Sequence, residues 1–226
     1  MKRIHVSEGV STWLVNGERI RKELNENFVQ SGHHARFPFI PTNEFWIDTD
    51  TNFREHRFFI DRFFAERILL RSGMDIDAAE SIAGDLEQHE REEAISAELR
   101  QLRLHRKSLR EKIRRTPFLP YHSDQLSIWI VDGKMVRDLV FLEYDMGGHD
   151  RVYPWIPEKE IWIEEILPEK ERKFILLHEL HERFLMGQGK KYPEAHHGAT
   201  IIEDRLRDHP ETLEARIQEE LAKNLE

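Results

Sequence analysis

The sequence predicts an α+β protein in which one structural unit occurs twice along the chain. Three observations lead to this class: an internal repeat, short strand-like segments rich in Trp, Ile and Val, and longer segments with apolar residues at helical spacing. The repeat runs without a gap, at an offset of 116 residues, between residues 11–87 (the first copy) and residues 127–203 (the second copy). Shared residues are expected to build the fold, and differing residues are where function is expected.

Each copy is expected to begin with a β-hairpin. In the first copy a strand at residues 12–15 is followed by Asn16-Gly17, a dipeptide typical of type I′ turns, and Asp132-Gly133 stands at the same place in the second copy. A proline-bracketed segment follows and ends in a strand at residues 45–47 or 161–163. The prolines favour an edge position for this strand.

Two helices are expected after the strands of each copy. The first helix is expected to end at Gly73 or Gly189, because glycine is common just after a helix. The second helix of the first copy is expected to run as far as Arg115, and a short last helix is expected near residues 211–224. The first helices are expected at about residues 53–71 and 168–186, and the second helices are expected to begin near Asp75 and Pro193.

The composition fits two small domains, which we place at residues 1–116 and 117–226. The chain has no run of about 18 apolar residues, so we expect no membrane span and a cytoplasmic protein. A formal charge of −9 argues against nucleic-acid binding. With no cysteine, any metal must be held by His, Asp or Glu. The sequence does not indicate an oligomeric state.

The first helix of the second copy carries residues that can hold a metal. His178 and Glu182 are four residues apart, so their side chains share a helix face and can converge on one ion. Glu179 stands where a carboxylate can deprotonate a metal-activated water. A third ligand must come from elsewhere, and His196 at the start of the next helix is the obvious donor.

This motif and the order of the elements resemble the zincin-like metallopeptidases, in which an edge strand precedes a helix bearing His-Glu-x-x-His and a later helix adds a ligand. The resemblance covers roughly residues 127–206. It implies zinc on His178, Glu182 and His196, with Glu179 as general base. The chain departs from the family pattern at Glu182, which makes the motif His-Glu-x-x-Glu.

Other histidines remain alternative ligands or structural residues. His181 is three residues from His178 and can face the same ion, and His197 adjoins the third candidate ligand. His33 and His149 follow a glycine in both copies, so we interpret them as residues that order a loop.

Two acidic residues also have structural interpretations. Glu182 can form an ion pair with the adjacent Arg183 instead of binding a metal. Glu203, which matches Glu87 of the first copy, reads first as structural, but it can also accept a hydrogen bond from a ligand imidazole and orient it.

The first copy serves as an internal control. At the offset of 116 residues, His178 becomes Arg62 and the proposed base becomes Phe63, so the first copy cannot perform the same hydrolysis. Glu66 is retained, and Glu80 stands where the third ligand would be. We therefore expect the Arg62 guanidinium to replace the metal between Glu66 and Glu80.

Taken together, these residues predict a metal-dependent hydrolase of peptide or amide bonds with an inactive first copy. The metal is expected to be Zn²⁺ or another divalent transition metal, and the partner a peptide or protein substrate. Two alternatives remain open: a non-enzymatic interaction protein that keeps a zincin-like shell, and a metal site that only joins two helices.

Overall fold

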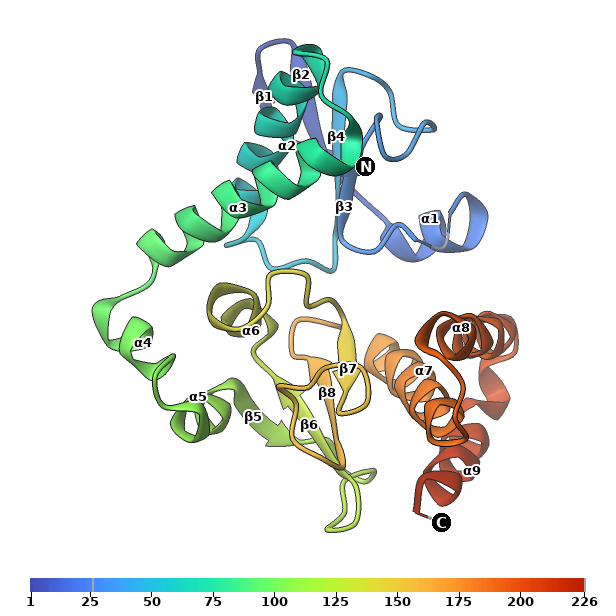
Figure 1. Cartoon of the computed structure of the whole chain (residues 1–226). Helices are drawn as coiled ribbons and strands as arrows, with labels where there is room; N and C mark the ends of the chain where they lie inside the picture. Colours follow the sequence, from blue (N-terminus) through green and yellow to red (C-terminus); the bar gives the residue numbers. More distant parts are fainter. Residues whose placement is uncertain (26, 226) are drawn as a thin grey trace. The chain divides into compact units, whose positions relative to one another are not determined.

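The computed structural model describes residues 1–25 and 27–225. Within them the chain has the predicted α+β class, with two four-stranded mixed sheets and helices beside each (Figure 1). The chain divides into two compact units. The N-terminal unit is Met1–His105 with Arg137–Leu142, and the C-terminal unit is Arg106–Val136 with Glu143–Glu226.

The elements of the two units follow in chain order. In residues 1–105 these are β1 (Lys2–Ser7), β2 (Val10–Val15), α1 (Gly17–Glu23), β3 (Ser31–His33), β4 (Glu44–Asp48), α2 (His56–Arg71), α3 (Ile76–Ala94) and α4 (Ala97–Leu102). From residue 106 on these are α5 (Arg106–Ile113), β5 (Arg114–Pro117), β6 (Ser127–Val131), α6 (Gly133–Leu139), β7 (Gly147–His149), β8 (Glu160–Glu164), α7 (Glu169–Gly187), α8 (Tyr192–Asp208), a 3₁₀ turn (Pro210–Thr212) and α9 (Leu213–Leu225).

The two sheets have the same topology and the same register. Their strand orders are β1-β2-β4-β3 and β5-β6-β8-β7, each with one parallel pair at the centre. Trp13 lies opposite Trp46 in the first sheet, and Trp129 lies opposite Trp162 in the second. Each pairing is shifted by the offset of the sequence repeat, so the internal duplication is also a structural one.

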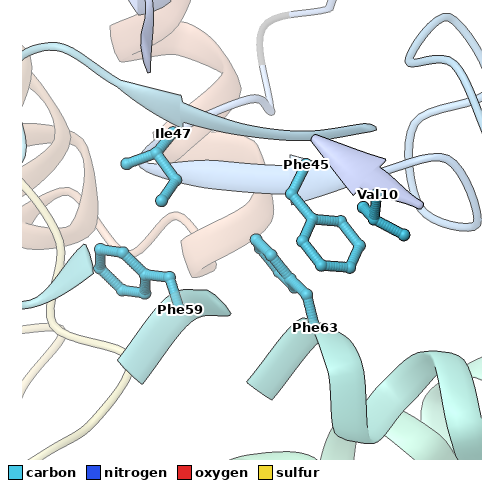
Figure 2. Packing of buried hydrophobic residues seen from close by; sticks show 5 residues of the cluster. All are labelled: Val10, Phe45, Ile47, Phe59 and Phe63. Carbon is cyan, nitrogen blue, oxygen red and sulfur yellow. The ribbon is translucent and has the colours of Figure 1, made fainter. Parts of the chain in front are cut away.

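The helix that follows each sheet packs on it through apolar side chains. In the N-terminal unit Phe59 and Phe63 of α2 point toward Phe45 and Ile47 of β4, with Val10 of β2 beside them (Figure 2). The Phe45 and Phe63 ring centroids are 5.2 Å apart. Burial of these side chains fixes which face of α2 meets the sheet.

The predicted hairpin turn at Asn16-Gly17 is wrong. Asn16 caps α1, because its side-chain oxygen accepts a hydrogen bond from a first-turn backbone N–H at 2.7 Å. The Gly17 N–H donates to Asp48 at 3.0 Å, and a methyl group on Gly17 would lie 1.8 Å from the other oxygen of that carboxylate. The dipeptide therefore begins a helix over a buried carboxylate, and Asp132-Gly133 does the same over Glu164.

The hairpin of the first sheet lies one strand earlier. β1 and β2 are joined by Glu8-Gly9, whose φ values of 50° and 76° are those that a type I′ turn requires. The expected edge position of the strands at residues 45–47 and 161–163 is also wrong, since β4 lies between β2 and β3, and β8 lies between β6 and β7. The prolines belong to the loop before β4 and leave the strand free to pair on both sides.

The helices after the sheets lie close to their predicted positions. α2 and α7 end next to Gly73 and Gly189, whose φ values of 92° and 89° are left-handed. The predicted continuation to Arg115 is wrong: α3 ends at Ala94 because Ser96 caps a new helix. None of the helices in the described part of the chain combines the length and apolarity needed to cross a bilayer.

Candidate metal centre

α7 and α8 bring the candidate ligands together in the C-terminal unit. The helices are joined by a short turn at Gly189 and pack along one another (Figure 1). Ala195 and Ala199 of α8 are completely buried. Because these positions carry only methyl side chains, α8 approaches α7 closely, and His196 in its first turn reaches the ligand pair on α7.

Three donor atoms converge between the two helices. His178 Nε2 lies 3.1 Å from His196 Nδ1 and 3.6 Å from Glu182 Oε2. His196 Nδ1 lies 2.8 Å from the same Glu182 oxygen. The side chains of His178 and Glu182 are buried, whereas His196 is exposed.

This triangle fits a tetrahedral metal ion. Zinc binds nitrogen and oxygen at about 2.0–2.2 Å, so two ligands of a tetrahedral site lie about 3.3–3.6 Å apart. The three donor separations, from 2.8 to 3.6 Å, bracket that range. Two imidazoles and one carboxylate also suit iron, manganese or cobalt, so the donor set is compatible with several divalent transition metals.

Glu179 is a buried carboxylate beside this group. It is 8% exposed, and within the described residues it accepts no hydrogen bond and forms no ion pair. Burial, and then the charge of Glu182, raises its pKa above the usual range. A methyl group on Gly147 of β7 would lie 2.7 Å from Ile175 and 3.0 Å from a Glu179 oxygen, so the backbone of the edge strand lies close to this carboxylate. Phe63 occupies the matching position of the first copy and is a core residue (Figure 2).

A network of buried ion pairs contacts His178 through its Nδ1, the ring nitrogen that lies away from the donor group. This nitrogen lies 2.8 Å from Glu203, a carboxylate of α8. Glu203 accepts a hydrogen bond from Arg207 at 2.9 Å, and Arg207 also donates to Glu171 at 2.9 Å. Glu203 therefore orients the imidazole so that Nε2 faces the donor group, the arrangement common for metal-binding histidines.

The charges in this network determine the protonation of His178. Burial alone would lower the pKa of His178, but contacts with Glu182 and Glu203 outweigh burial and raise it to about 10. Burial raises the pKa of Glu203, and contacts with His178 and Arg207 outweigh it and lower that pKa to about 2. Without a metal, an imidazolium therefore bridges two carboxylates, and a metal must displace that proton to bind.

In the first copy Arg62 occupies the place of His178. Its Nε donates to Glu66 at 2.8 Å, and its Nη1 lies 3.4 Å from Glu87 on α3. Glu87 accepts from Arg91, and Arg91 also donates to Glu55. The same network of ion pairs thus exists in both copies, at the offset of 116 residues. The two networks differ in one cation, Arg62 in the first copy and His178 in the second. The counterparts in the second copy are Glu182, His178, Glu203, Arg207 and Glu171.

The prediction that Arg62 pairs with Glu80 is wrong, although the predicted guanidinium bridge between α2 and α3 is present. Arg62 links Glu66 to Glu87, whereas Glu80 pairs with Arg36 at 3.1 Å. Glu80 and Glu87 are seven residues apart on α3, so both face α2 and the axial register of the helices decides which one Arg62 meets.

The alternative histidines lie outside the donor group. His181 points to α9, where its Nδ1 lies 3.0 Å from Glu220. His197 is exposed on α8 and belongs to neither group of possible ligands among the described residues. Helical spacing alone could not separate His178 from His181, because α9 provides the acid that engages the second of them.

Glu182 is not paired with Arg183 in the described structure. The Arg183 guanidinium forms two hydrogen bonds with Asp150, at 2.7 and 3.2 Å. Glu182 instead contacts two imidazoles: His149 at 3.0 Å through one oxygen and His196 at 2.8 Å through the other. The carboxylate is therefore fixed from both sides and directs one oxygen at the donor group.

His149 of β7 has a counterpart in the first copy. His33 Nε2 contacts Glu66 at 2.5 Å, as His149 Nε2 contacts Glu182. This contact therefore persists in the first copy, whose described residues form no group of possible metal ligands. It belongs to the shared scaffold, and in the second copy it orients a candidate ligand.

Two tyrosines near the site were missed by sequence reasoning. Burial, and then the negative charges of Glu182 and Glu179, raises the pKa of Tyr192 to about 12. Burial and the charge of Glu179 raise the pKa of Tyr153 as well. The first copy has Ile76 in place of Tyr192 and Phe37 in place of Tyr153. A search of the repeat for hydroxyl groups present only in the second copy would therefore have found both tyrosines.

Compared with known proteins, the chain matches no family model, no curated protein and no solved structure. Among the described residues, two overlapping groups could hold a metal ion. They are His178, Glu182 and His196, and His149, Glu179 and Glu182.

Proposed function

We propose that the chain is a metal-dependent hydrolase of peptide or amide bonds, with Zn²⁺ or a similar ion on His178, Glu182 and His196. One observation carries the proposal: an unpaired buried carboxylate, Glu179, adjoins three converging donors. Burial of a carboxylate without a partner is costly, so its presence calls for a proton, a water or a cation beside it. The first copy has Phe63 there and needs none of these.

The residues of the second copy can perform each proton transfer of the hydrolysis. A divalent metal supplies a Lewis acid that activates water and polarises a carbonyl oxygen. Glu179 accepts a proton from the attacking water while the water oxygen bonds to the carbonyl carbon. The C–N bond then breaks, and Glu179 returns the proton to the leaving nitrogen. The hydroxyl groups of Tyr153 and Tyr192 can donate to the carbonyl oxygen as it gains negative charge.

The resemblance to zincin-like metallopeptidases supports the same proposal. α7 carries His178 and Glu182 in one turn, and α8 supplies His196. The edge strand beside α7 is β7 and not the expected strand at residues 160–164, and the backbone groups on its outer side can pair with an extended peptide. An extended substrate placed along β7 would pass next to Glu179, because Gly147 allows close approach there.

The test combines metal analysis with a peptide library. Purified wild-type protein is expected to hold about one equivalent of metal, because the proposal places one ion on His178, Glu182 and His196. Glu179→Gln should keep the metal and lose hydrolysis by at least about a hundredfold, since general-base catalysis contributes about 10²–10⁴. His196→Ala should lose both, and His197→Ala is its matched control because that neighbouring imidazole is exposed and outside the group.

A wild-type protein with bound metal but no hydrolysis of any library member would refute the catalytic part of the proposal. Equal metal content in the His196→Ala and wild-type proteins would refute the ligand assignment. Loss of metal from the His197→Ala protein would do the same.

A second candidate function follows from the protonation of His178. The imidazolium can close the ion-pair network between Glu182 and Glu203 as Arg62 does in the first copy. In that case the chain is a non-enzymatic interaction protein with a zincin-like shell and holds no metal. Metal content near zero after preparation in zinc-containing buffer would favour this function over hydrolysis.

A further inference from the structure

A cavity of about 300 Å³ lies in the N-terminal unit, next to β3 and the C-terminal half of α2. Ala35, Phe45 and Leu70 form its apolar walls, and His34, Arg67 and Arg71 add basic groups. None of the residues that line it is acidic. The volume lies at the lower end of the range for small-molecule sites.

The second copy fills the matching place with its own side chains. Arg151 donates to the backbone oxygen of Arg183 at 3.0 Å. A methyl group on Gly187 would lie 1.8 Å from the Arg151 guanidinium, so Arg151 occupies the space beside that glycine. Asp150 neutralises Arg183 through two hydrogen bonds, at 2.7 and 3.2 Å. The position is filled and its charge is balanced.

Three substitutions empty this place in the first copy and change its charge. Ala35 replaces Arg151, His34 replaces Asp150 and Arg71 replaces Gly187, all at the offset of 116 residues. The first exchange removes the side chain that would fill the cavity. The second removes the carboxylate, and the third adds a guanidinium.

Arg67 is the residue whose partner has been lost. It matches Arg183, but in the described part of the chain its guanidinium donates to a backbone oxygen, that of Thr42, at 2.6 Å. No carboxylate lies within ion-pair distance of it in that part of the chain. The neighbouring His33 is already engaged by Glu66, and His34 contacts the Ile40 backbone oxygen. Arg67 therefore lines the cavity without a counter-ion among the described residues.

We propose that this cavity binds a small organic carboxylate with a compact apolar body. A guanidinium fork matches a carboxylate in geometry and charge, and the aromatic and aliphatic walls suit the remainder of the ligand. The proposal is independent of the hydrolase function, because the first copy lacks the donor triangle.

Binding of phenylacetate to the full-length protein tests the proposal by calorimetric titration. Phenylacetamide, which has the same body without the charge, and inorganic phosphate, which has charge without the body, are the comparison probes. Phenylacetate is expected to bind saturably and at least about tenfold more tightly than either comparison probe. A hydrogen bond to a charged group contributes enough binding free energy for an affinity difference of at least about tenfold. No saturable binding of phenylacetate would overturn the proposal, and so would equal affinity for either comparison probe.

Variants locate the binding in this cavity. Arg67→Gln should weaken phenylacetate binding at least about tenfold. Arg36→Gln is the matched control, because Arg36 is nearby in sequence but does not line the cavity. The triple variant His34→Asp, Ala35→Arg, Arg71→Gly transfers the arrangement of the second copy and should abolish binding. Unchanged affinity in either the Arg67→Gln or the triple variant would overturn the assignment.

Discussion

The two copies share one buried ion-pair network and differ in the cation at its centre. In the first copy Arg62 joins Glu66 to Glu87, and in the second His178 joins Glu182 to Glu203. A guanidinium cannot lose its charge at accessible pH, whereas an imidazole can give up a proton and bind a metal. The comparison teaches that the group that could hold an ion differs from the closed network at two ligand positions: an imidazole replaces the guanidinium of Arg62, and His196 stands in place of Glu80.

The sharpest way to break this comparison is to give the second copy the cation of the first. His178→Arg should reduce the metal content from about one equivalent to near zero and lower hydrolysis by at least about a thousandfold, since it removes a ligand and supplies a fixed charge. Metal analysis and peptide-cleavage rates provide the measurement. Arg62→His is the reciprocal control and should leave the metal of the second copy in place. Retained metal in the His178→Arg protein would show that the triangle is not the binding site.

A second test removes the arginine that stands at the matching place of each ion-pair network, Arg91 in the first copy and Arg207 in the second. Arg91 is 0% exposed and contacts Glu55, Glu87 and Asp138, so Arg91→Leu removes a buried positive charge that three carboxylates share. The expected loss in free energy of unfolding is about 3–5 kcal/mol. Arg207→Leu should cost less, because Arg207 is more exposed, with a side chain 8% accessible. Urea unfolding followed by circular dichroism measures both, and a smaller loss for Arg91→Leu than for Arg207→Leu would contradict the comparison.

The support of the imidazole can be tested without touching a ligand. Glu203→Gln keeps the shape of the residue but weakens the hydrogen bond that orients His178, so metal affinity should fall about 10–100-fold. Competition with a fluorescent zinc indicator measures this change. Glu87→Gln at the matching place of the first copy should leave metal affinity unaltered. An equal effect of the two substitutions would mean that Glu203 acts through stability alone.

The smallest expected difference concerns acid stability of the C-terminal unit. Burial raises the pKa of Glu220, but contacts with His181 and Lys223 outweigh burial and lower it to about 2. Because this folded-state pKa lies below the unfolded value, the stabilisation is complete above about pH 4.5 and is lost as the pH falls toward 2. Glu220→Gln should remove about 1–2 kcal/mol at neutral pH and flatten this part of the profile. Denaturant unfolding between pH 2 and 6 provides the check, and an unchanged slope would contradict the assignment.

The sequence predicts those features that depend on neighbours within a few residues. Spacing of four residues places His178 and Glu182 on one face of α7, and Gly189 marks the turn that returns His196 toward them. The repeat itself predicts that the copies have equivalent sheets. These signals are local, or are repeated along the chain, and need no knowledge of packing.

Contacts between distant residues decide the features that the sequence leaves open. Asn16-Gly17 suits a hairpin turn or a helix start, and the choice depends on Asp48, which lies under the Gly17 N–H from 31 residues away. In the same way, the axial register of two helices gives Arg62 the partner Glu87 in place of Glu80. Neither residue pair has a sequence signal of its own.

The position of Arg62 has a consequence for the behaviour of the protein under metal limitation. A counter-ion that is part of the polypeptide cannot diffuse away, so the N-terminal unit keeps its central charge whatever the supply of ions. Treatment with a chelator should therefore alter the C-terminal unit alone. The N-terminal unit would then keep its counter-charge in every metal concentration. It can therefore serve as an internal control for the effect of metal removal on the C-terminal unit.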